Sequence, residues 1–161
     1  MISDIAIRLA QSAIPAGLLG LIALGSCVPP PAGGDRMAQT PPIPPDQARI
    51  WFMRELEPGT ATHAPTVYAD GAAIGYSPQS TMFYRDVAPG THVFDVENCL
   101  KLPESTRTLN FTAGDEVSLQ VTSLQNYAGW DCSPSDTYYL SPVPAQVRPW
   151  YFARLTNLGA R

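Results

Sequence analysis

A series of short, strand-like runs separated by turn signals constrains this chain more than any other feature. The runs are rich in aromatic and β-branched side chains, which fit the pleated surface of a sheet. They lie at residues 48–54, 66–70, 73–76, 81–87, 91–97, 109–112, 116–122 and 137–143. Asp70-Gly71 and Pro89-Gly90 stand between runs, and both dipeptides favour tight turns. Short strands with regularly spaced turns are typical of an antiparallel β-sandwich.

The run at residues 116–122 is the clearest single strand. Val117, Leu119 and Val121 alternate with polar residues, so one face of this strand is apolar. No run of ten or more residues in this region has a convincing helical period. We therefore expect residues 47–145 to form an all-β domain, an antiparallel β-sandwich of about seven strands.

The C-terminal tail, residues 146–161, has a different pattern. Pro149 suits a first helical turn and Gly159 suits a helix end, so the tail predicts a short helix. The apolar residues on one face of that helix are Tyr151, Leu155 and Leu158. We expect this face to pack on the sandwich. Two alternatives stay open: an interfacial or partner-binding helix led by the aromatic run Trp150–Phe152, or a final strand.

Residues 1–26 have the pattern of a secretory signal. Arg8 and the amino terminus supply positive charge, which Asp4 weakens, and an apolar stretch follows from Ile14 to Leu24. That stretch is shorter than the roughly 20 residues of a membrane span and fits a signal core of about 7–15 residues. A short anchor helix is the alternative.

The end of this signal resembles the lipobox of bacterial lipoproteins. Leu24-Gly25-Ser26-Cys27 places a leucine and two small residues before a cysteine. The resemblance implies that Cys27 carries the lipid and becomes the first residue of the mature chain. Several acyl chains give stable membrane anchoring. Val28 follows instead of an aspartate, which in Gram-negative lipoproteins favours the outer membrane, facing the periplasm.

A proline-rich linker separates the lipidated cysteine from the domain. Seven of the 17 prolines fall between Val28 and Pro45, and the segment has too few apolar side chains to build a core. We therefore assign residues 27–46 to the lipidated cysteine and a disordered tether, which could hold the domain up to roughly 50 Å from the lipid. The alternative is a proline-rich docking motif for a partner groove.

The segment from Ala48 to Thr122 resembles an uncharacterised family of bacterial envelope lipoproteins with a domain of unknown function. It is also similar to the PEGA-type and transthyretin-like surface sandwiches. The motifs that carry the likeness are Ile50–Arg54, Val67–Gly71, Ile74-Gly75, Val87–His92, Ala113-Gly114 and Val117–Val121. Cys99, Cys132 and the aromatic stretch after them depart from that pattern. The resemblance implies a β-sandwich and an envelope location, and it implies no activity.

Cys99 and Cys132 remain once Cys27 is assigned to lipid. An even pair of cysteines in an oxidising compartment predicts a disulfide bond. Such a bridge stabilises a fold by nearly 4 kcal/mol at most in the chain-entropy model. The chain has no Cys-x-x-Cys and no paired histidines, so we expect no metal site.

The sequence carries no catalytic motif, and we expect neither enzymatic activity nor a cofactor. It contains no Gly-x-Ser-x-Gly and no His-Glu-x-x-His. His63 and His92 are expected as solvated or hydrogen-bonded surface residues. The carboxylate pairs Asp95/Glu97 and Asp115/Glu116 sit beside turns and are expected to solubilise strand ends. The alternative is that one of the pairs flanks a groove.

The aromatic residues Tyr127, Trp130, Tyr138 and Tyr139 are the best candidates for a binding surface. Tyrosine and tryptophan on rigid loops suit glycan stacking or protein hot spots. The alternative is that these rings fill one end of the sandwich core.

The charge balance excludes one class of partner. Ten basic residues against fourteen acidic ones give a net charge of −4, and the basic residues are not clustered, so we expect no nucleic-acid binding. The sequence predicts a membrane-anchored envelope lipoprotein that acts as a non-enzymatic protein- or glycan-binding module. The alternative is an inhibitor or accessory subunit of a periplasmic hydrolase or of an envelope assembly machine. A hydrolase that uses a carboxylate pair is a third hypothesis.

Overall fold

The structure, a computed structural model, describes residues 40–60, 63–98, 103–124 and 137–161. These residues form nine strands, one α-helix and one 3-10 helix. In chain order they are β1 (Ala48–Arg54), β2 (Thr66–Ala69), β3 (Ala72–Tyr76), β4 (Thr81–Val87), β5 (Gly90–Val96), η1 (Pro103–Ser105), β6 (Thr106–Phe111), β7 (Glu116–Ser123), β8 (Tyr138–Pro142), α2 (Arg148–Arg154) and β9 (Thr156–Ala160).

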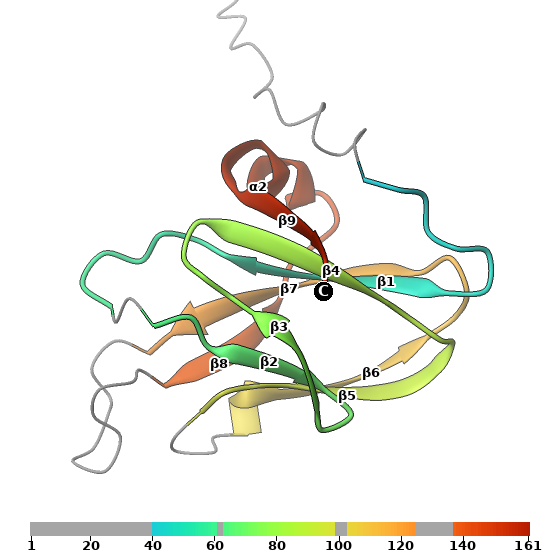
Figure 1. Cartoon of the computed structure of the whole chain (residues 1–161), viewed down its shortest axis with the longest axis horizontal. Helices are drawn as coiled ribbons and strands as arrows, with labels where there is room; N and C mark the ends of the chain where they lie inside the picture. The colour runs from blue at the N-terminus through green and yellow to red at the C-terminus, as the bar shows by residue number, and fades with distance from the viewer. Residues whose placement is uncertain (1–39, 61–62, 99–102, 125–136) are drawn as a thin grey trace, which may run out of the picture.

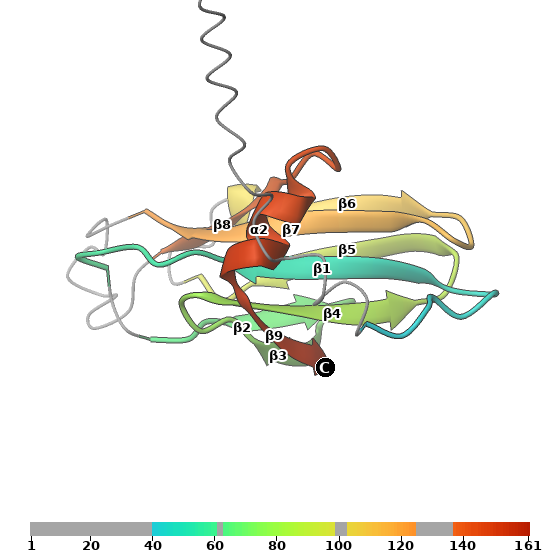
Figure 2. The same cartoon turned by 90° about the horizontal axis from the view of Figure 1, so that it is seen from above.

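Two sheets make up the fold, as the strand pattern predicted. One sheet has five strands in the order β8-β7-β1-β4-β9, and the other has four in the order β3-β2-β5-β6 (Figures 1 and 2). The all-β, two-sheet architecture is confirmed. Strands β1 and β4 also match the runs expected at 48–54 and 81–87 residue for residue.

The expectation of a purely antiparallel sandwich is wrong for the five-stranded sheet. Strand β1 pairs with β7 in parallel, and β4 pairs with β9 in parallel. The chain leaves this sheet after β4, forms β5 and β6 in the other sheet, and returns as β7 in the direction of β1. Parallel neighbours require a crossover of this kind. Helix α2 provides the second crossover, from β8 at one edge to β9 at the other.

The main core lies between the two sheets and is rich in phenylalanine. Phe52 of β1 stacks on Phe83 of β4 with ring centroids 5.1 Å apart, and it meets Phe94 of the facing sheet at 5.8 Å. Phe94 in turn makes an edge contact with Phe111 at 6.0 Å. All four rings are buried. Aromatic contacts of this geometry join the sheets across the sandwich.

A second, smaller core lies on the outer face of the five-stranded sheet, beneath α2. Its members are Trp51, Met53, Met82, Tyr84, Phe152 and Leu155. Trp51 meets Tyr84 at 4.9 Å and Phe152 of α2 at 4.6 Å. Strand β1 is therefore buried on both faces over its whole length, which explains why its sequence is almost continuously aromatic and aliphatic.

The tail does contain a helix, but the helix ends earlier than expected. Its cap is Leu155, whose backbone is extended (φ −89°, ψ 146°), and Gly159 lies inside β9 instead of ending the helix. Gly159 has a φ of +80°, and its amide donates to Asn157 Oδ1 at 2.8 Å. The irregular pairing of β9 with β4 uses this glycine conformation. The tail, residues 146–161, thus contributes both α2 and an edge strand of the sandwich.

Candidate functional site

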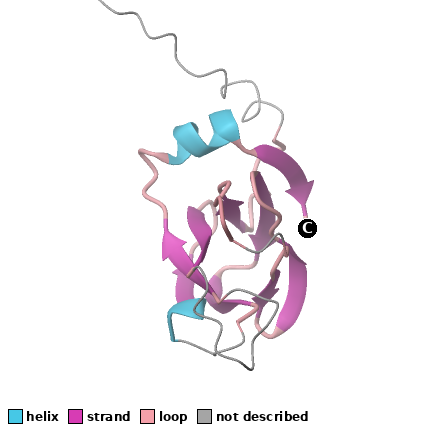
Figure 3. Cartoon of the chain, turned by 90° about the vertical axis from the view of Figure 1, so that its left-hand side faces the viewer, coloured by secondary structure: helices cyan, strands magenta, loops and turns pink. Residues whose placement is uncertain are grey.

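The outer faces of the two sheets differ in what covers them. Helix α2 packs on the five-stranded sheet, on the opposite side of the molecule from β2 and β5 (Figures 1 and 3). The outer face of the four-stranded sheet is exposed instead: Tyr76 is 62% exposed and Val93 is 41% exposed. We call it the bare face.

Strand register places Tyr68, Asp95 and Thr106 in one row across the bare face. Tyr68 of β2 lies opposite Asp95 of β5, and Asp95 lies opposite Thr106 of β6. Their sequence neighbours Val67, Phe94 and Val96 point into the core, so the row points outward. The row thus brings one aromatic ring, one carboxylate and one hydroxyl together from three strands.

A pocket of about 480 Å³ opens at this row. Its lining residues are Tyr68, Asp95, Val96, Glu97, Asn98, Pro103, Ser105 and Thr106. The volume falls within the range of about 300–1,000 Å³ that is usual for small-molecule sites. Six of these eight side chains carry hydrogen-bonding groups, so the pocket is suited to a polar ligand.

The carboxylates of Asp95 and Glu97 line this pocket together. Asp95 Oδ1 accepts from its neighbour's amide, Val96 N, at 2.8 Å and from Thr106 Oγ1 at 3.3 Å. Glu97 Oε2 accepts from Thr66 N at 2.9 Å and from Thr66 Oγ1 at 3.0 Å. One alternative from the sequence was that this acidic pair flanks a groove, and Asp95 and Glu97 do line the same pocket.

The environment of Glu97 favours its ionised form. Burial raises the pKa of Glu97, but the hydrogen bonds from Thr66 and the nearby His63, whose Nε2 lies 3.1 Å from Glu97 Oε1, outweigh that effect. The net result is a pKa below the ordinary value. A general acid needs a raised carboxyl pKa, so Glu97 is suited to accept hydrogen bonds and not to donate a proton.

Asp115 and Glu116 do not form a corresponding pair. Asp115 Oδ2 accepts from Thr112 N at 2.7 Å and so closes the turn before β7, which lowers the pKa of Asp115. Glu116 lies on the face under α2, where Trp51 Nε1 donates to its Oε1 at 2.8 Å and Arg148 forms an ion pair with it. Successive residues of a strand point to opposite faces, which separates the two carboxylates.

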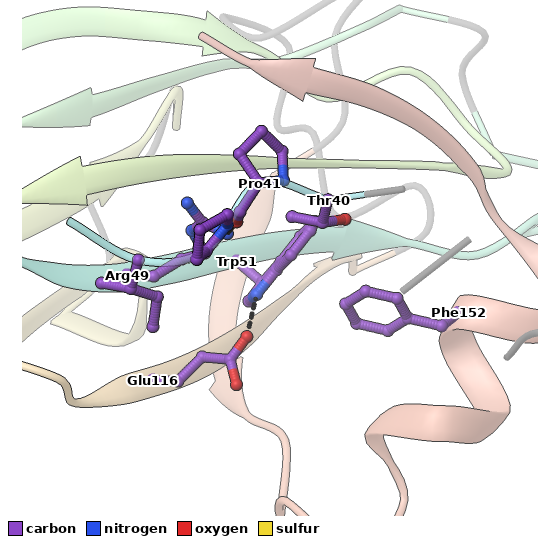
Figure 4. A pocket seen from close by; sticks show the side chains of 8 residues that line it. Thr40, Pro41, Arg49, Trp51, Glu116 and Phe152 are labelled. Carbon is purple, nitrogen blue, oxygen red and sulfur yellow. Dashed lines mark hydrogen bonds between the residues drawn. The ribbon is translucent and has the colours of Figure 1, made fainter. Parts of the chain in front are cut away.

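A second pocket, of about 190 Å³, lies beside α2 (Figure 4). It is lined by Arg49 and Trp51 of β1, by Glu116 of β7, by Phe152 of α2 and by the segment 40–43. Trp51 is only 1% exposed, so little aromatic surface is available to a ligand. This pocket is a seam between β1, β7, α2 and the end of the linker.

Arg49 holds that seam together. Its Nε and Nη2 donate to both carboxylate oxygens of Asp86 at 2.6 and 2.9 Å, and its Nη1 donates to the carbonyl of Pro41 at 2.6 Å. The guanidinium also lies 4.0 Å from the centre of the Tyr84 ring. Burial lowers the pKa of Arg49, but Asp86 outweighs this and leaves it above the ordinary value. The end of the linker is thereby fixed to the sandwich.

Most of the residues that the sequence singled out lie outside the described part of the chain. They are Cys27, Cys99, Tyr127, Trp130 and Cys132. The lipid attachment, the disulfide bond and the aromatic loop stay predictions.

Tyr138 and Tyr139, the other two candidates, are both on β8. Tyr138 is 0% exposed, lies under the guanidinium of Arg54 at 5.0 Å, and donates its hydroxyl to the carbonyl of His63 at 3.4 Å. It belongs to the core, as the alternative interpretation had it, and presents no surface to a ligand. Tyr139 is half-buried and pairs with Thr122 of β7.

The histidines are hydrogen-bonded residues at the domain surface. His92 Nδ1 lies 2.7 Å from Asp70 Oδ2, and His92 Nε2 lies 2.9 Å from the carbonyl of Ala88. The bonds to Asp70 and Ala88 raise the pKa of His92, and the bond from His92 lowers the pKa of Asp70. This contact ties the β2–β3 hairpin to the turn before β5.

Sequence reasoning missed two residues of structural importance, Tyr68 and Arg54. Tyr68 gives no signal in the four-residue strand β2 until the pairing with β5 is known. Arg54 is fully buried at the end of β1, where its Nη1 donates to the carbonyls of His63 at 2.8 Å and Ser77 at 3.0 Å. The aromatic run that precedes Arg54 could have predicted this burial. A strand that is buried on both faces also buries the charged residue at its end.

Models of known protein families do not match this sequence, and neither do curated protein sequences. Within the described ranges, no cluster of three or more His, Cys, Asp or Glu side chains is placed to hold a metal ion. The same residues contain no helix long and apolar enough to cross a bilayer.

Proposed function

We propose that this protein is a lipid-anchored module of the bacterial envelope that binds glycans, without catalysis, on its bare face. The observation that carries the proposal is the pocket of about 480 Å³ at the row formed by Tyr68, Asp95 and Thr106. A rigid two-sheet scaffold holds this row, since each member sits on a different strand of one sheet.

The chemistry of the row fits a polyhydroxylated ligand. The carboxyl groups of Asp95 and Glu97 accept hydrogen bonds from sugar hydroxyls, and the side chains of Asn98 and Thr106 add neutral polar groups. Tyr68 supplies an amphipathic ring against which the apolar side of a sugar can pack. A protein partner is favoured less, because hot spots are built from desolvated apolar and aromatic pockets.

The anchor rests on the lipobox-like sequence before Cys27 and on the proline-rich linker. The final part of that linker, residues 40–43, borders the seam pocket, where Arg49 binds the Pro41 carbonyl. The tether therefore extends the domain from the membrane into the periplasm, while the end of the tether at Pro41 stays attached to the sandwich. A Cys27→Ala variant is expected to leave the membrane fraction, and its retention there would contradict the anchor.

Binding is tested with the purified, detergent-solubilised protein against oligosaccharides released from bacterial envelopes, measured by calorimetry. We expect saturable binding that Tyr68→Ala weakens roughly tenfold or more, equivalent to about 1.4 kcal/mol. Trp150→Ala, on the opposite side of the molecule, is the matched aromatic control and is expected to bind normally. Equal binding by the Tyr68 variant would contradict the proposed site. Capture of an envelope hydrolase without any glycan binding would favour the inhibitor or accessory-subunit hypothesis.

A further inference from the structure

The outer side of α2 and the loop before it form an exposed surface that is apolar and carries no negative charge. We call this surface the α2 patch; it consists of Pro144, Ala145, Val147, Pro149, Trp150 and Arg154, all exposed. Residues 137–161 contain three arginines and no aspartate or glutamate, in a chain whose net charge is −4. Of these arginines only Arg154 lies on the patch, since Arg148 is buried and paired with Glu116. The patch thus presents one positive and no negative side chain to a negatively charged layer.

Helical spacing explains why the patch is exposed. Arg148 and Phe152, four residues apart, face the sheet and are buried. Trp150 and Arg154, also four residues apart, lie on the opposite side of the helix. Trp150 is 41% exposed, and the Arg154 guanidinium lies 3.9 Å from the centre of its ring. A tryptophan paired with an arginine on the exposed side of a short helix is a combination found at membrane surfaces.

The linker reaches the domain beside this patch. Thr40, the first described residue, accepts a hydrogen bond from Asn157 Nδ2 at 3.4 Å, three residues after α2 ends. Thr40, Pro41 and Phe152 of α2 line the same pocket around Trp51 (Figure 4). Twelve residues, 28–39, separate Thr40 from Cys27. Extended, they reach no more than about 40 Å, and they join the domain on its α2 side.

We propose that the α2 patch lies on the headgroup layer of the membrane that holds the lipidated chain, with the bare face turned away from it. This orientation rests on the anchor in the proposed function. Trp150 enters the interfacial region and Arg154 pairs with lipid phosphates, as aromatic and basic side chains do at bilayer surfaces. A seven-residue helix binds lipid weakly alone, and the anchor raises its effective concentration at the surface.

The charges of the two faces agree with this orientation. The bare face exposes Asp95 and Glu97 in one pocket, and Asp70 lies on the hairpin at its edge. These carboxylates would be repelled by anionic headgroups, whereas the α2 patch would be attracted. A membrane-bound domain in this orientation leaves the proposed glycan pocket open to the periplasm.

Tryptophan quenching tests the orientation in the full lipidated protein. The protein is reconstituted in phosphatidylethanolamine–phosphatidylglycerol vesicles whose acyl chains are brominated, and emission is compared with that in unbrominated vesicles. A Trp130→Phe background leaves Trp150 and the buried Trp51. The matched control adds Trp150→Phe and Tyr76→Trp, which moves the exposed indole to the bare face. We expect bromine to quench the emission of Trp150, and we expect that emission to be shifted to the blue. The exposed indole of the control should show neither effect.

Two negative results are distinguishable. If the background protein floats with the vesicles but Trp150 is quenched no more than the control indole, the orientation is overturned and the anchor stands. If the protein does not float with the vesicles at all, the anchor and the orientation fail together. Protection of Trp150 only when other envelope proteins are added would assign the patch to a protein partner and would likewise overturn the membrane contact.

Discussion

The two sheets of this sandwich use their outer faces in opposite ways. The five-stranded sheet buries Trp51, Met53 and Tyr84 beneath α2. The ion pairs Arg49–Asp86 and Arg148–Glu116 lie at the margins of this cluster. The four-stranded sheet leaves its outer face to solvent and gathers two carboxylates in a pocket. The first arrangement stabilises the domain, and the second leaves polar groups available to a ligand. A face that contributes little to stability can be changed for binding without loss of the fold.

The largest expected contrast is in stability. Trp51→Ala removes the ring that joins Tyr84 to Phe152 and should lower the free energy of unfolding by about 3–5 kcal/mol. Tyr76→Ala, the matched aromatic truncation on the bare face, should cost at most about 1 kcal/mol because its ring is exposed. Urea denaturation measures both. Equal losses in the two variants would mean that the bare face is covered in solution.

A smaller contrast is expected for the carboxylates. Glu116→Gln leaves Arg148, which is 8% exposed, without its counter-ion and should cost about 1–3 kcal/mol. Asp95→Asn makes the same chemical change on the bare face and should stay within about 0.5 kcal/mol. The two variants can be compared by their denaturation midpoints at one pH. A more destabilised Asp95 variant would assign that carboxylate a structural role and weaken the case for its availability to ligand.

The smallest expected effect is a pH dependence that belongs to one sheet only. The raised pKa of His92 means that its pairing with Asp70 stabilises the domain fully below the ordinary histidine value of 6.5, and that this contribution is lost as pH rises through the raised value. The lowered pKa of Asp70 means that the contribution of its ionised carboxylate to stability is present above pH 3.8. This contribution is lost as the pH falls through the lowered value. His92→Gln should therefore lower Tm most between pH 3.8 and 6.5.

Asp86→Asn is the control for this pH dependence on the covered face. Its partner, Arg49, stays protonated throughout, so the Tm deficit of the Asp86 variant should not shrink between about pH 6 and 8. The deficit of the His92 variant should shrink over the same range. Parallel curves for the two variants would refute the protonated His92–Asp70 pair.

The sequence predicted strands better than it predicted their arrangement. β1 and β4 could be placed residue for residue because their aromatic runs are flanked by clear turns. The parallel pairings of β7 and β9 could not, because they depend on where the chain crosses between sheets. Gly159 was interpreted as a helix end, although the same positive φ also serves an irregular strand.

The candidate site could be predicted only in part, for a related reason. Asp95 and Glu97 are two residues apart, so their shared face follows from the period of a strand. Tyr68 and Thr106 join them only through the pairing of β2 and β6 with β5, which no local pattern encodes. The aromatic run at 150–152 was expected on a helix, and α2 carries it, with Trp150 outward and Phe152 inward.

The most direct test of the division between the faces is a map of amide chemical shifts during titration with an envelope oligosaccharide that binds. The account predicts that the largest shifts fall on Tyr68, on residues 95–98 and on Thr106, with α2 unchanged. Shifts concentrated on residues 147–154, or spread equally over both faces, would contradict it.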